Sequence, residues 1–148
     1  MSSAESHIAL ANKNQAVLRH LSSDLDSYSE WVATVAFYKA LHIVESVFVE
    51  IGVGNASDHG DRLKKLKAGR RFDHIFKHYR PMWVASTVAR YLEDPSDQTP
   101  YSSFQDYLRP EQVMKDIVCH RLRQVEKSAL KLCPKFEGRL HVWGDGTG

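Results

Sequence analysis

The stretch WVATVAFYKALHIVESVFVEIG, residues 31–52, decides the fold class of this chain. Its apolar side chains recur every three or four residues, which is the period of an α-helix. The opposite side carries Tyr38, His42 and Glu45 rather than a run of lysines. A helix with so few charges belongs in a core, so we predict a central helix that ends at Gly52 as a C-cap. The apolar stripe consists of Ala33, Phe37, Ala40, Leu41, Val44, Val47, Phe48 and Ile51.

The segment before this stretch has the pattern of a second helix and a short turn. Ser2, Ser3 and Ser6 are each suited to cap a helix that runs to about Leu21. The following residues, SSDLDSYSE, are typical of a turn, and Ser29 is expected to be the N-cap of the central helix.

Three more helices are expected after the turn GVGNASD, and no stretch of the chain alternates convincingly as a strand. Pro81 falls inside the middle one of these helices, where a kink or a restart is expected because proline lacks the backbone N–H. The expected spans are Asp58 to Gly69, about Arg71 to about Glu93, and Pro110 to Cys133, where Pro134 stops the last helix.

Length and composition favour one compact domain. The chain has 148 residues, of which 43% are hydrophobic and 26% are charged, which is ordinary for a globular protein. Four substantial helices with short connections predict an all-α fold, an antiparallel bundle of four to five helices. We assign residues 1–133 to a single helical domain and residues 134–148 to a C-terminal tail, which is either partly disordered or docked through Val142 and Trp143.

Several protein classes do not fit the sequence. No apolar run approaches the roughly 20 residues that cross a bilayer, and the first residues lack the pattern of a secretory signal. Cys119 and Cys133 would lie about 21 Å apart on one helix, which is too far for a disulfide. We therefore expect a reduced, cytoplasmic protein that does not bind a membrane.

The net charge of +2 conceals a strongly basic segment. Residues 62–80 carry eight Lys and Arg against Asp73 alone, whereas the residues before them are acidic and those after them are balanced. Such a patch attracts phosphate and nucleic acid, although runs of charge are also typical of a plain solvated face. The segment includes RRFDHIFKHYR, residues 70–80, with two histidines among its cations.

Metal and nucleophile chemistry have little support. His74 and His78 are four residues apart, but no glutamate stands beside the first histidine as in a hydrolytic zinc helix. His42 and Glu45 have the reverse order of the Glu-x-x-His unit of di-iron bundles, and no second copy exists. Ser86 lacks the glycine-flanked elbow of a nucleophilic serine. We therefore expect no metal and no cofactor.

Phosphodiester chemistry without a metal remains open. RNA is cut when its own 2′-OH attacks the adjacent phosphate, which requires a base, an acid and a cation for the developing charge. Arg71 and His78 are seven residues apart, so on one helix they face the same way and supply these groups. The alternative is a basic surface helix whose histidines have no chemical role.

The motifs of the central region resemble the HEPN superfamily (higher eukaryotes and prokaryotes nucleotide-binding domain). The resemblance covers about residues 28–92 and is greatest to small prokaryotic members with a "YxALH" helix, a following "H-x-x-R" and a later "Y…S-x-x-A-R-Y". The matching positions are Tyr38, Ala40, Leu41 and His42, then His59 and Arg62, then Tyr79, Ser86, Ala89, Arg90 and Tyr91.

The resemblance implies a HEPN-like helical bundle that is commonly a homodimer. Many members are metal-independent endoribonucleases with an Arg-x(4–6)-His motif from each of two protomers, and Arg71 and His78 are the matching catalytic pair here. Other members lack that activity and serve as adaptors, often with a nucleotidyltransferase antitoxin or within an effector complex of a defence system. Phe72, where active members commonly have a polar residue, favours the adaptor alternative.

Our leading hypothesis is a HEPN-like protein that binds RNA or another nucleic acid, with cleavage by Arg71 and His78 as its sharper form. Arg62 has a structural alternative as the partner of Asp58 or Glu45, and Arg90 as the partner of a buried carboxylate. His42 is expected to be a hydrogen-bonded core histidine. The expected nucleic-acid contacts are His59, Arg62, Lys64, Lys65, Lys67, Arg70, Lys77, Arg80 and Arg90.

Overall fold

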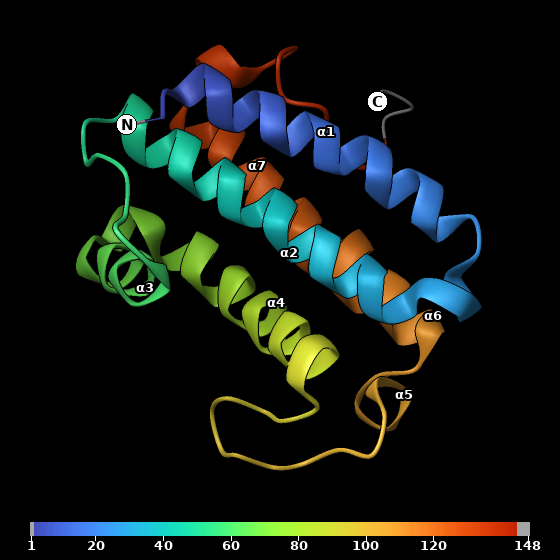
Figure 1. Ribbon diagram of the computed structural model, residues 1–148. Coiled ribbons are helices and arrows are strands. Elements are labelled where there is room, and N and C mark those ends of the chain that lie inside the picture. Colours follow the sequence, from blue (N-terminus) through green and yellow to red (C-terminus); the bar gives the residue numbers. More distant parts are fainter. Residues whose placement is uncertain (1, 145–148) are drawn as a thin grey trace.

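The apolar stripe of residues 31–52 lies in α2 (Leu25–Glu50), and the other long helices pack around it. The computed structural model describes residues 2–144 and confirms an all-α bundle (Figure 1). Within these residues the strand-like pairing is confined to one isolated bridge between Glu93 and Pro100. The remaining helices are α1 (Ala4–Ser22), α3 (His59–Ala68), α4 (Asp73–Tyr91), α5 (Phe104–Tyr107), α6 (Pro110–Gln112) and α7 (Arg123–Leu132), with 3₁₀ turns η1 (Arg70–Phe72) and η3 (Pro134–Phe136) and the π-helical segment η2 (Val113–Leu122).

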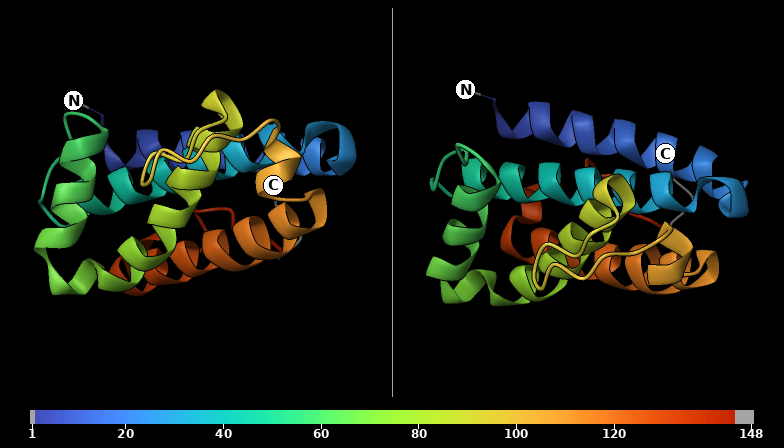
Figure 2. Two further views of the ribbon diagram at one scale, coloured as in Figure 1. Left: turned by 90° about the horizontal axis from the view of Figure 1, so that it is seen from below. Right: turned by 60° about the horizontal axis from the view of Figure 1, so that its bottom comes forward.

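Consecutive long helices run in opposite directions, as the colours in Figure 1 show. On one side α2 packs along α1, and on the other it contacts α4 and the run of α6, η2 and α7. The short α3 stands at one end of the bundle, and the loop between α4 and α5 lies on the α4 side of the bundle, away from α1 (Figures 1 and 2). The core side chains that α2 contributes are fully buried: Val32, Ala33, Ala36, Ala40, Ile43, Val44, Val47 and Phe48.

Most helix ends lie where the sequence predicts them. Ser3 caps α1 by accepting a hydrogen bond from the Ser6 N–H (3.1 Å), and Asp58 caps α3 by accepting one from the Asp61 N–H (2.8 Å). Gly52 follows the end of α2 with a φ of +86°, a left-handed conformation that favours glycine.

The predicted N-cap at Ser29 is wrong. Helix α2 begins at Leu25 after Asp24, and Tyr28 interrupts it with a φ of −125° and a ψ of 21°. Ser29 is buried just beyond this kink, and its hydroxyl accepts a hydrogen bond from Gln105 Nε2 (3.3 Å). The Ser29 hydroxyl, which the local sequence pattern assigned to a helix cap, therefore makes a contact with α5 instead.

Two features of the later helices differ from the expectation. Helix α4 continues through Pro81, so no restart occurs there, and it ends at Leu92 in a left-handed conformation (φ 56°). The last long helix begins with Pro110, as predicted, but Val113–Leu122 takes the wider π-helical pattern before α7 resumes the α form. Residue periodicity does not distinguish these two helical forms over so short a span.

The segment after Cys133 docks on the bundle. Phe136 and Leu140 are buried with the core, and the Trp143 N–H donates to the carboxylate of Glu126 (3.1 and 3.2 Å). Docking is therefore the alternative that holds for residues 134–144, while residue 1 of the predicted domain and residues 145–148 of the predicted tail lie outside the described residues.

A buried ion pair lies at the centre of the molecule. The side chains of Lys39 and Glu126 are both fully buried, and the Lys39 ammonium donates to Glu126 and to Gln15 Oε1 (2.5 Å). Helices α1, α2 and α7 thus meet at one charge-assisted network, which Trp143 completes from the docked segment.

Helix α2 is also long and apolar enough to span a membrane by those two criteria, with a mean hydropathy of 1.5. However, 72% of the apolar window is buried inside the bundle, and the core helix of a soluble protein passes the same test. Its position in the core therefore accounts for its composition.

Candidate functional site

The basic segment, residues 62–80, spans α3, η1 and the first half of α4. Six of its cations extend to the surface, whereas Arg62 is buried and Lys65 is half-buried. Lys65 donates to the backbone carbonyl of Asn55 (2.9 Å) and pairs with Asp61 (3.5 Å), so it supports the loop before α3. The exposed members are Lys64, Lys67, Arg70, Arg71, Lys77 and Arg80.

One end of this segment forms a groove with α7, with a volume of about 560 Å³. Among the described residues, those that line the groove include three cations and no carboxylate. Sequence reasoning found Arg71 but missed Lys127 and Lys131, whose spacing of one helical turn was the available signal. The lining residues are Arg71, His74, Lys127, Ser128, Lys131 and Leu132.

Within one chain, Arg71 and His78 are not brought together. The Arg71 guanidinium lies over the ring of Phe72 (5.1 Å) and faces the groove, whereas His78 is only 3% exposed. The prediction placed both residues on one continuous α-helix. Arg71 belongs instead to the 3₁₀ turn that precedes α4, and of the two residues only Arg71 lines the groove.

His78 is held in a cluster of basic side chains from two elements. Arg121 donates a hydrogen bond to His78 Nδ1 (3.2 Å), and the rings of His74 and His120 lie 4.7 and 5.1 Å from the His78 ring. Burial, followed by the charges of His74, Arg121, His120 and Lys77, lowers the pKa of His78 to about 4. Its imidazole is therefore neutral at pH 7 and is a weak base there.

The histidine cluster lacks the arrangement of a metal centre. Within residues 2–144, no group of three or more His, Cys, Asp or Glu side chains is placed to hold a metal ion. His74 is engaged with Gln124, whose Oε1 lies 3.0 Å from its Nε2.

A second pocket lies between α2, α3 and α4 and has a volume of about 320 Å³. Six positions of the HEPN resemblance, widely separated in the sequence, meet here: Tyr38, Leu41, His59, Arg62, Arg90 and Tyr91. Two other residues of this pocket, Trp83 and Thr87, were not among the predicted site residues. The pocket is completed by Phe37.

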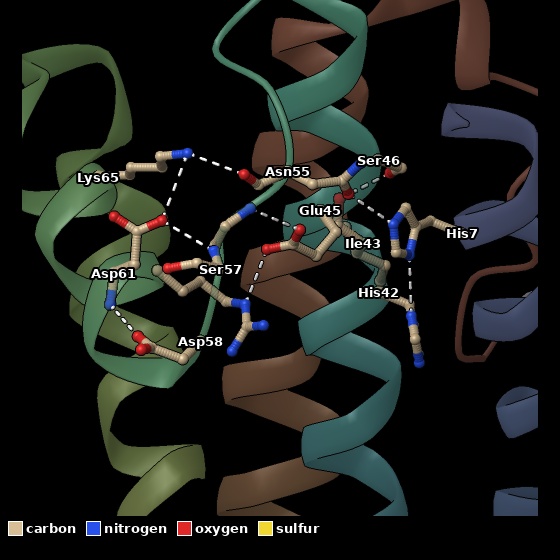
Figure 3. Close-up of polar contacts among 12 residues, drawn as sticks. His7, His42, Ile43, Glu45, Ser46, Asn55, Ser57, Asp58, Asp61 and Lys65 are labelled. Carbon is tan, nitrogen blue, oxygen red and sulfur yellow. Dashed lines mark hydrogen bonds and ion pairs between the residues drawn. The ribbon is translucent and has the colours of Figure 1, made fainter. Parts of the chain in front are cut away.

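Glu45 fixes the wall of this pocket that Arg62 forms. The Arg62 Nε donates to Glu45 Oε2 (2.8 Å), and the Ala56 N–H donates to Oε1 of the same carboxylate (3.0 Å). Figure 3 shows Glu45 on α2 reaching toward the loop before α3. Of the two structural partners considered for Arg62, Glu45 is therefore the one present.

A histidine pair supports the same loop from α1. His42 and His7 share a hydrogen bond between their Nδ1 atoms (3.0 Å), and His7 Nε2 lies 2.8 Å from Asn55 Oδ1 (Figure 3). Burial, then His7 and Arg62, lower the pKa of His42, while Glu45 raises it. His42 is thus half-buried and hydrogen-bonded, with a role in positioning the loop.

Arg90 has no carboxylate partner among the described residues, so the expected tie to a buried acid is wrong. Its Nε donates to the Ser86 carbonyl (3.1 Å), and its Nη1 donates to the Tyr38 hydroxyl (3.2 Å). The guanidinium also lies 5.8 Å from the Tyr38 ring centre and 5.4 Å from that of Tyr91. Its charge is therefore uncompensated at the mouth of the pocket.

His59 brings an unused polar atom to the pocket. Its ring stacks on Trp83 with centres 4.4 Å apart, and its buried Nε2 has no hydrogen-bond partner. Burial, followed by the charges of Arg62 and Arg90, lowers the pKa of His59, while Asp58 raises it. The ring is neutral at pH 7, so Nε2 can donate or accept one hydrogen bond according to its tautomer.

Comparison with known proteins adds no assignment. The chain matches no protein-family model, and neither the curated proteins nor the solved structures contain a significant match to it. The candidate sites therefore rest on their own geometry and charge.

Proposed function

We propose that this protein is a HEPN-like RNA-binding domain whose groove between α4 and α7 holds the phosphate backbone. The observation that supports this most strongly is the lining of that groove, with Arg71, Lys127 and Lys131 and no carboxylate among the described residues. Phosphate contacts of this kind dominate the affinity of nucleic-acid binding and do not depend on sequence. The exposed cations of residues 62–80 extend the same positive potential over α3 and α4.

Binding is tested with fluorescein-labelled single-stranded RNA, followed by fluorescence anisotropy at several salt concentrations. The variant Arg71→Gln/Lys127→Gln/Lys131→Gln should bind at least tenfold more weakly, with a shallower salt dependence. Each lost phosphate contact changes the slope of log K against log salt by about 0.7.

The matched control is Lys13→Gln/Arg109→Gln/Arg139→Gln, which removes the same charge from exposed positions elsewhere and should bind much as the wild type does. Equal affinity of the groove variant and this control would exclude the groove as the binding surface.

RNA cleavage is a second candidate activity of the same groove. Arg71 lines it together with His74, whereas His78 is buried behind it, so we assign the acid–base role to His74. In the homodimer that the resemblance implies, a second protomer supplies the other acid–base group. Cleavage in EDTA should be lost in His74→Ala and retained in His78→Ala, while the opposite result would return the role to His78.

A partner-binding adaptor is the alternative from another class. Trp31 on α2 is 57% exposed and lines a shallow pocket with Ala89 of α4, and contiguous exposed apolar surface is typical of a protein–protein contact. If the protein does not bind RNA, a protein partner at these residues becomes the better interpretation.

A further inference from the structure

The large apolar side chains that remain exposed are concentrated on one part of the molecule. Among the described residues, all of them belong to α1, to α2 or to the end of α4, and α3, η2 and α7 contribute none. An uneven distribution of this kind differs from the single exposed apolar residues that are normal on any protein surface. The exposed side chains are Leu10, Val17, Tyr28, Trp31, Tyr38, Tyr91 and Leu92.

On α1 and α2 these side chains lie in two stripes with the same spacing of four, three and four residues. Residues at this spacing share one side of a helix. The α1 stripe consists of Leu10, Asn14, Val17 and Leu21, and the α2 stripe consists of Trp31, Val35, Tyr38 and His42. Asn14, Leu21, Val35 and His42 are half-buried, and the other members are exposed.

The two stripes form one surface, the α1/α2 face. Helices α1 and α2 lie side by side and run in opposite directions (Figure 1). His7, which lies one turn before Leu10, is hydrogen-bonded to His42 (3.0 Å), so the stripes meet at this end (Figure 3). Each stripe extends over 11 residues, which is about 16 Å at 1.5 Å per residue.

A third helix fits the α1/α2 face better than an extended segment does. Ridges of side chains at this spacing pack into the grooves of another helix, and about 11 helical residues cover the same length. An extended peptide derives much of its affinity from pairing with the edge of a sheet. Among the described residues, the only strand-like pairing is the bridge between Glu93 and Pro100. The face therefore matches the apolar side of an amphipathic helix.

The charges beside the α1/α2 face favour a basic partner. Residues 20–38 include Asp24, Asp26 and Glu30 but no Lys or Arg. Among the described residues, none of these three carboxylates forms an ion pair. Arg90 of α4 lines a shallow pocket with Glu30, so one guanidinium faces three acids at this end of the face.

This excess of acid distinguishes the possible occupants of the face. A second copy of the chain would bring the same three acids to the contact, and an anionic membrane would be repelled by them. Lysine and arginine residues beside the apolar side of a partner helix would instead be attracted.

We propose that the α1/α2 face binds a basic amphipathic helix of another protein. The apolar side of that helix packs along the two stripes, with Trp31 and Tyr38 as its aromatic anchors. Its Lys and Arg residues pair with Asp24, Asp26 and Glu30. The face shares no residue with the groove between α4 and α7, so this proposal does not depend on RNA binding there.

The test begins with two display libraries of peptides of about 14 residues, roughly four helical turns. The helical library places Leu, Ile, Phe or Met at spacings of three and four, and the control library places the same number of apolar residues at alternating positions. All other positions are Lys, Glu, Gln or Ser. Selection on the wild-type protein should enrich only the helical library, with Lys more frequent than Glu. Failure to enrich helical peptides, or a preference for Glu, overturns the proposal.

An enriched peptide is then synthesised with a fluorescein label and titrated by fluorescence anisotropy. Trp31→Ala should weaken its binding at least about tenfold, because truncation of a central tryptophan is among the most costly changes at an interface. Leu10→Ser/Val17→Ser should weaken it at least about fivefold, because the α1 stripe becomes polar. The matched control is Met114→Ala, which shortens a half-buried apolar side chain on η2 and should leave the binding unchanged.

The contribution of charge is measured with Asp24→Asn/Asp26→Asn/Glu30→Gln. This variant should bind the peptide at least about fivefold more weakly and with a smaller dependence on salt, since screening acts only on the charges that remain. Thermal unfolding followed by circular dichroism verifies that it and the stripe variants are folded.

The matched control for charge is Asp73→Asn/Asp106→Asn/Glu137→Gln, which removes three exposed carboxylates elsewhere and should bind as the wild type does. Equal affinities of the two charge variants overturn the basic partner. The groove variant should also bind the peptide as the wild type does, so failure of RNA binding and failure of peptide binding are separate results.

Two further measurements distinguish the other occupants of the face. Analytical ultracentrifugation should show the same oligomeric state for the wild type and Trp31→Ala. Neither protein should sediment with vesicles of phosphatidylcholine or of phosphatidylglycerol. A dimer that Trp31→Ala dissociates would assign the face to a second copy, and vesicle binding that Trp31→Ala abolishes would assign it to a membrane. Either result overturns the proposal.

Discussion

At the scale of single residues, Glu45 holds Arg62 in place as one wall of the pocket between α2, α3 and α4. Its carboxylate accepts from Arg62 and from the Ala56 N–H, so one side chain joins α2, the loop before α3 and α3 itself. Glu45 and Arg62 side chains are only 4% and 10% exposed, and a nearly buried pair of this kind is costly to break because one charge is left without a partner.

Glu45→Ala should lower the free energy of unfolding by about 3 kcal/mol, since it leaves the Arg62 guanidinium buried and unpaired. Urea denaturation followed by circular dichroism measures the change. The control is Glu111→Ala, which breaks an ion pair whose two side chains are 67% and 74% exposed, and it should cost less than about 1 kcal/mol. Similar losses in the two variants would contradict a structural role for the Glu45 pair.

His78 contributes to the pH dependence of stability, in the same direction as His42 and His59, whose pKa values are also lowered. The pKa of His78 is about 4 in the folded protein and 6.5 in the unfolded chain. Above pH 6.5 the His78 ring is neutral in both states, so it does not reduce the stability of the fold there. As the pH falls from 6.5 to 4, His78 becomes protonated in the unfolded chain but stays neutral in the folded protein, which favours the unfolded state. The free energy of unfolding should therefore fall by about 1–3 kcal/mol over this range. Urea denaturation at pH 7.5 and 4.5 should show a smaller loss in His78→Gln than in the wild type, and an equal loss would contradict the assignment.

At the scale of elements, local signals in the sequence predicted the helices well wherever no distant contact intervened. The Asp58 cap of α3 and the glycine after α2 depend on residues close in sequence, and both are confirmed. Ser29 has an equally good local signal, but its hydroxyl is bonded to Gln105, which lies 76 residues away. A tertiary contact of this kind overrides the local preference, and no pattern within the segment reveals it.

Asp58→Ala should lower the free energy of unfolding by about 1 kcal/mol, the usual contribution of an N-cap side chain. The control is Asp24→Ala at the N-cap of α2, where the side chain makes no capping hydrogen bond, so that variant should change stability by less than half as much. Chemical denaturation of the two variants provides the comparison. An equal or larger loss in Asp24→Ala would show that the side-chain cap is not what stabilises the start of α3.

At the scale of the whole molecule, the sequence predicted an all-α bundle but could not predict which distant residues meet. The central helix was clear from the apolar stripe of residues 31–52. The groove required Lys127 and Lys131 to face Arg71 across two elements, and the pocket required Tyr38 to lie beside Arg90. Contacts of this kind depend on how the helices pack against one another, which the sequence pattern of a single helix does not specify.

The docked segment after Cys133 contributes to the stability of the entire bundle. Phe136 is 1% exposed, so Phe136→Ala should lower the free energy of unfolding by about 3–5 kcal/mol through lost burial and a cavity. The neighbouring control is Lys135→Ala, which removes the ion pair between the exposed Lys135 and the half-buried Glu50 and should cost much less than Phe136→Ala, about 1 kcal/mol. Thermal unfolding measures the stability of both variants. A small effect of Phe136→Ala would mean that the docked segment does not stabilise the bundle.

The buried pair of Lys39 and Glu126 also has a consequence for synthesis on the ribosome. The two residues are 87 positions apart in the sequence. At a translation rate of about 5–20 residues per second, Glu126 is therefore synthesised roughly 4–17 s after Lys39. Until Glu126 has been synthesised, the carboxylate that Lys39 contacts in the folded protein is missing, and burying a charge before its counter-ion is present costs several kcal/mol. We therefore expect that Lys39 is not buried until α7 has emerged, so that folding is completed only after most of the chain has been translated.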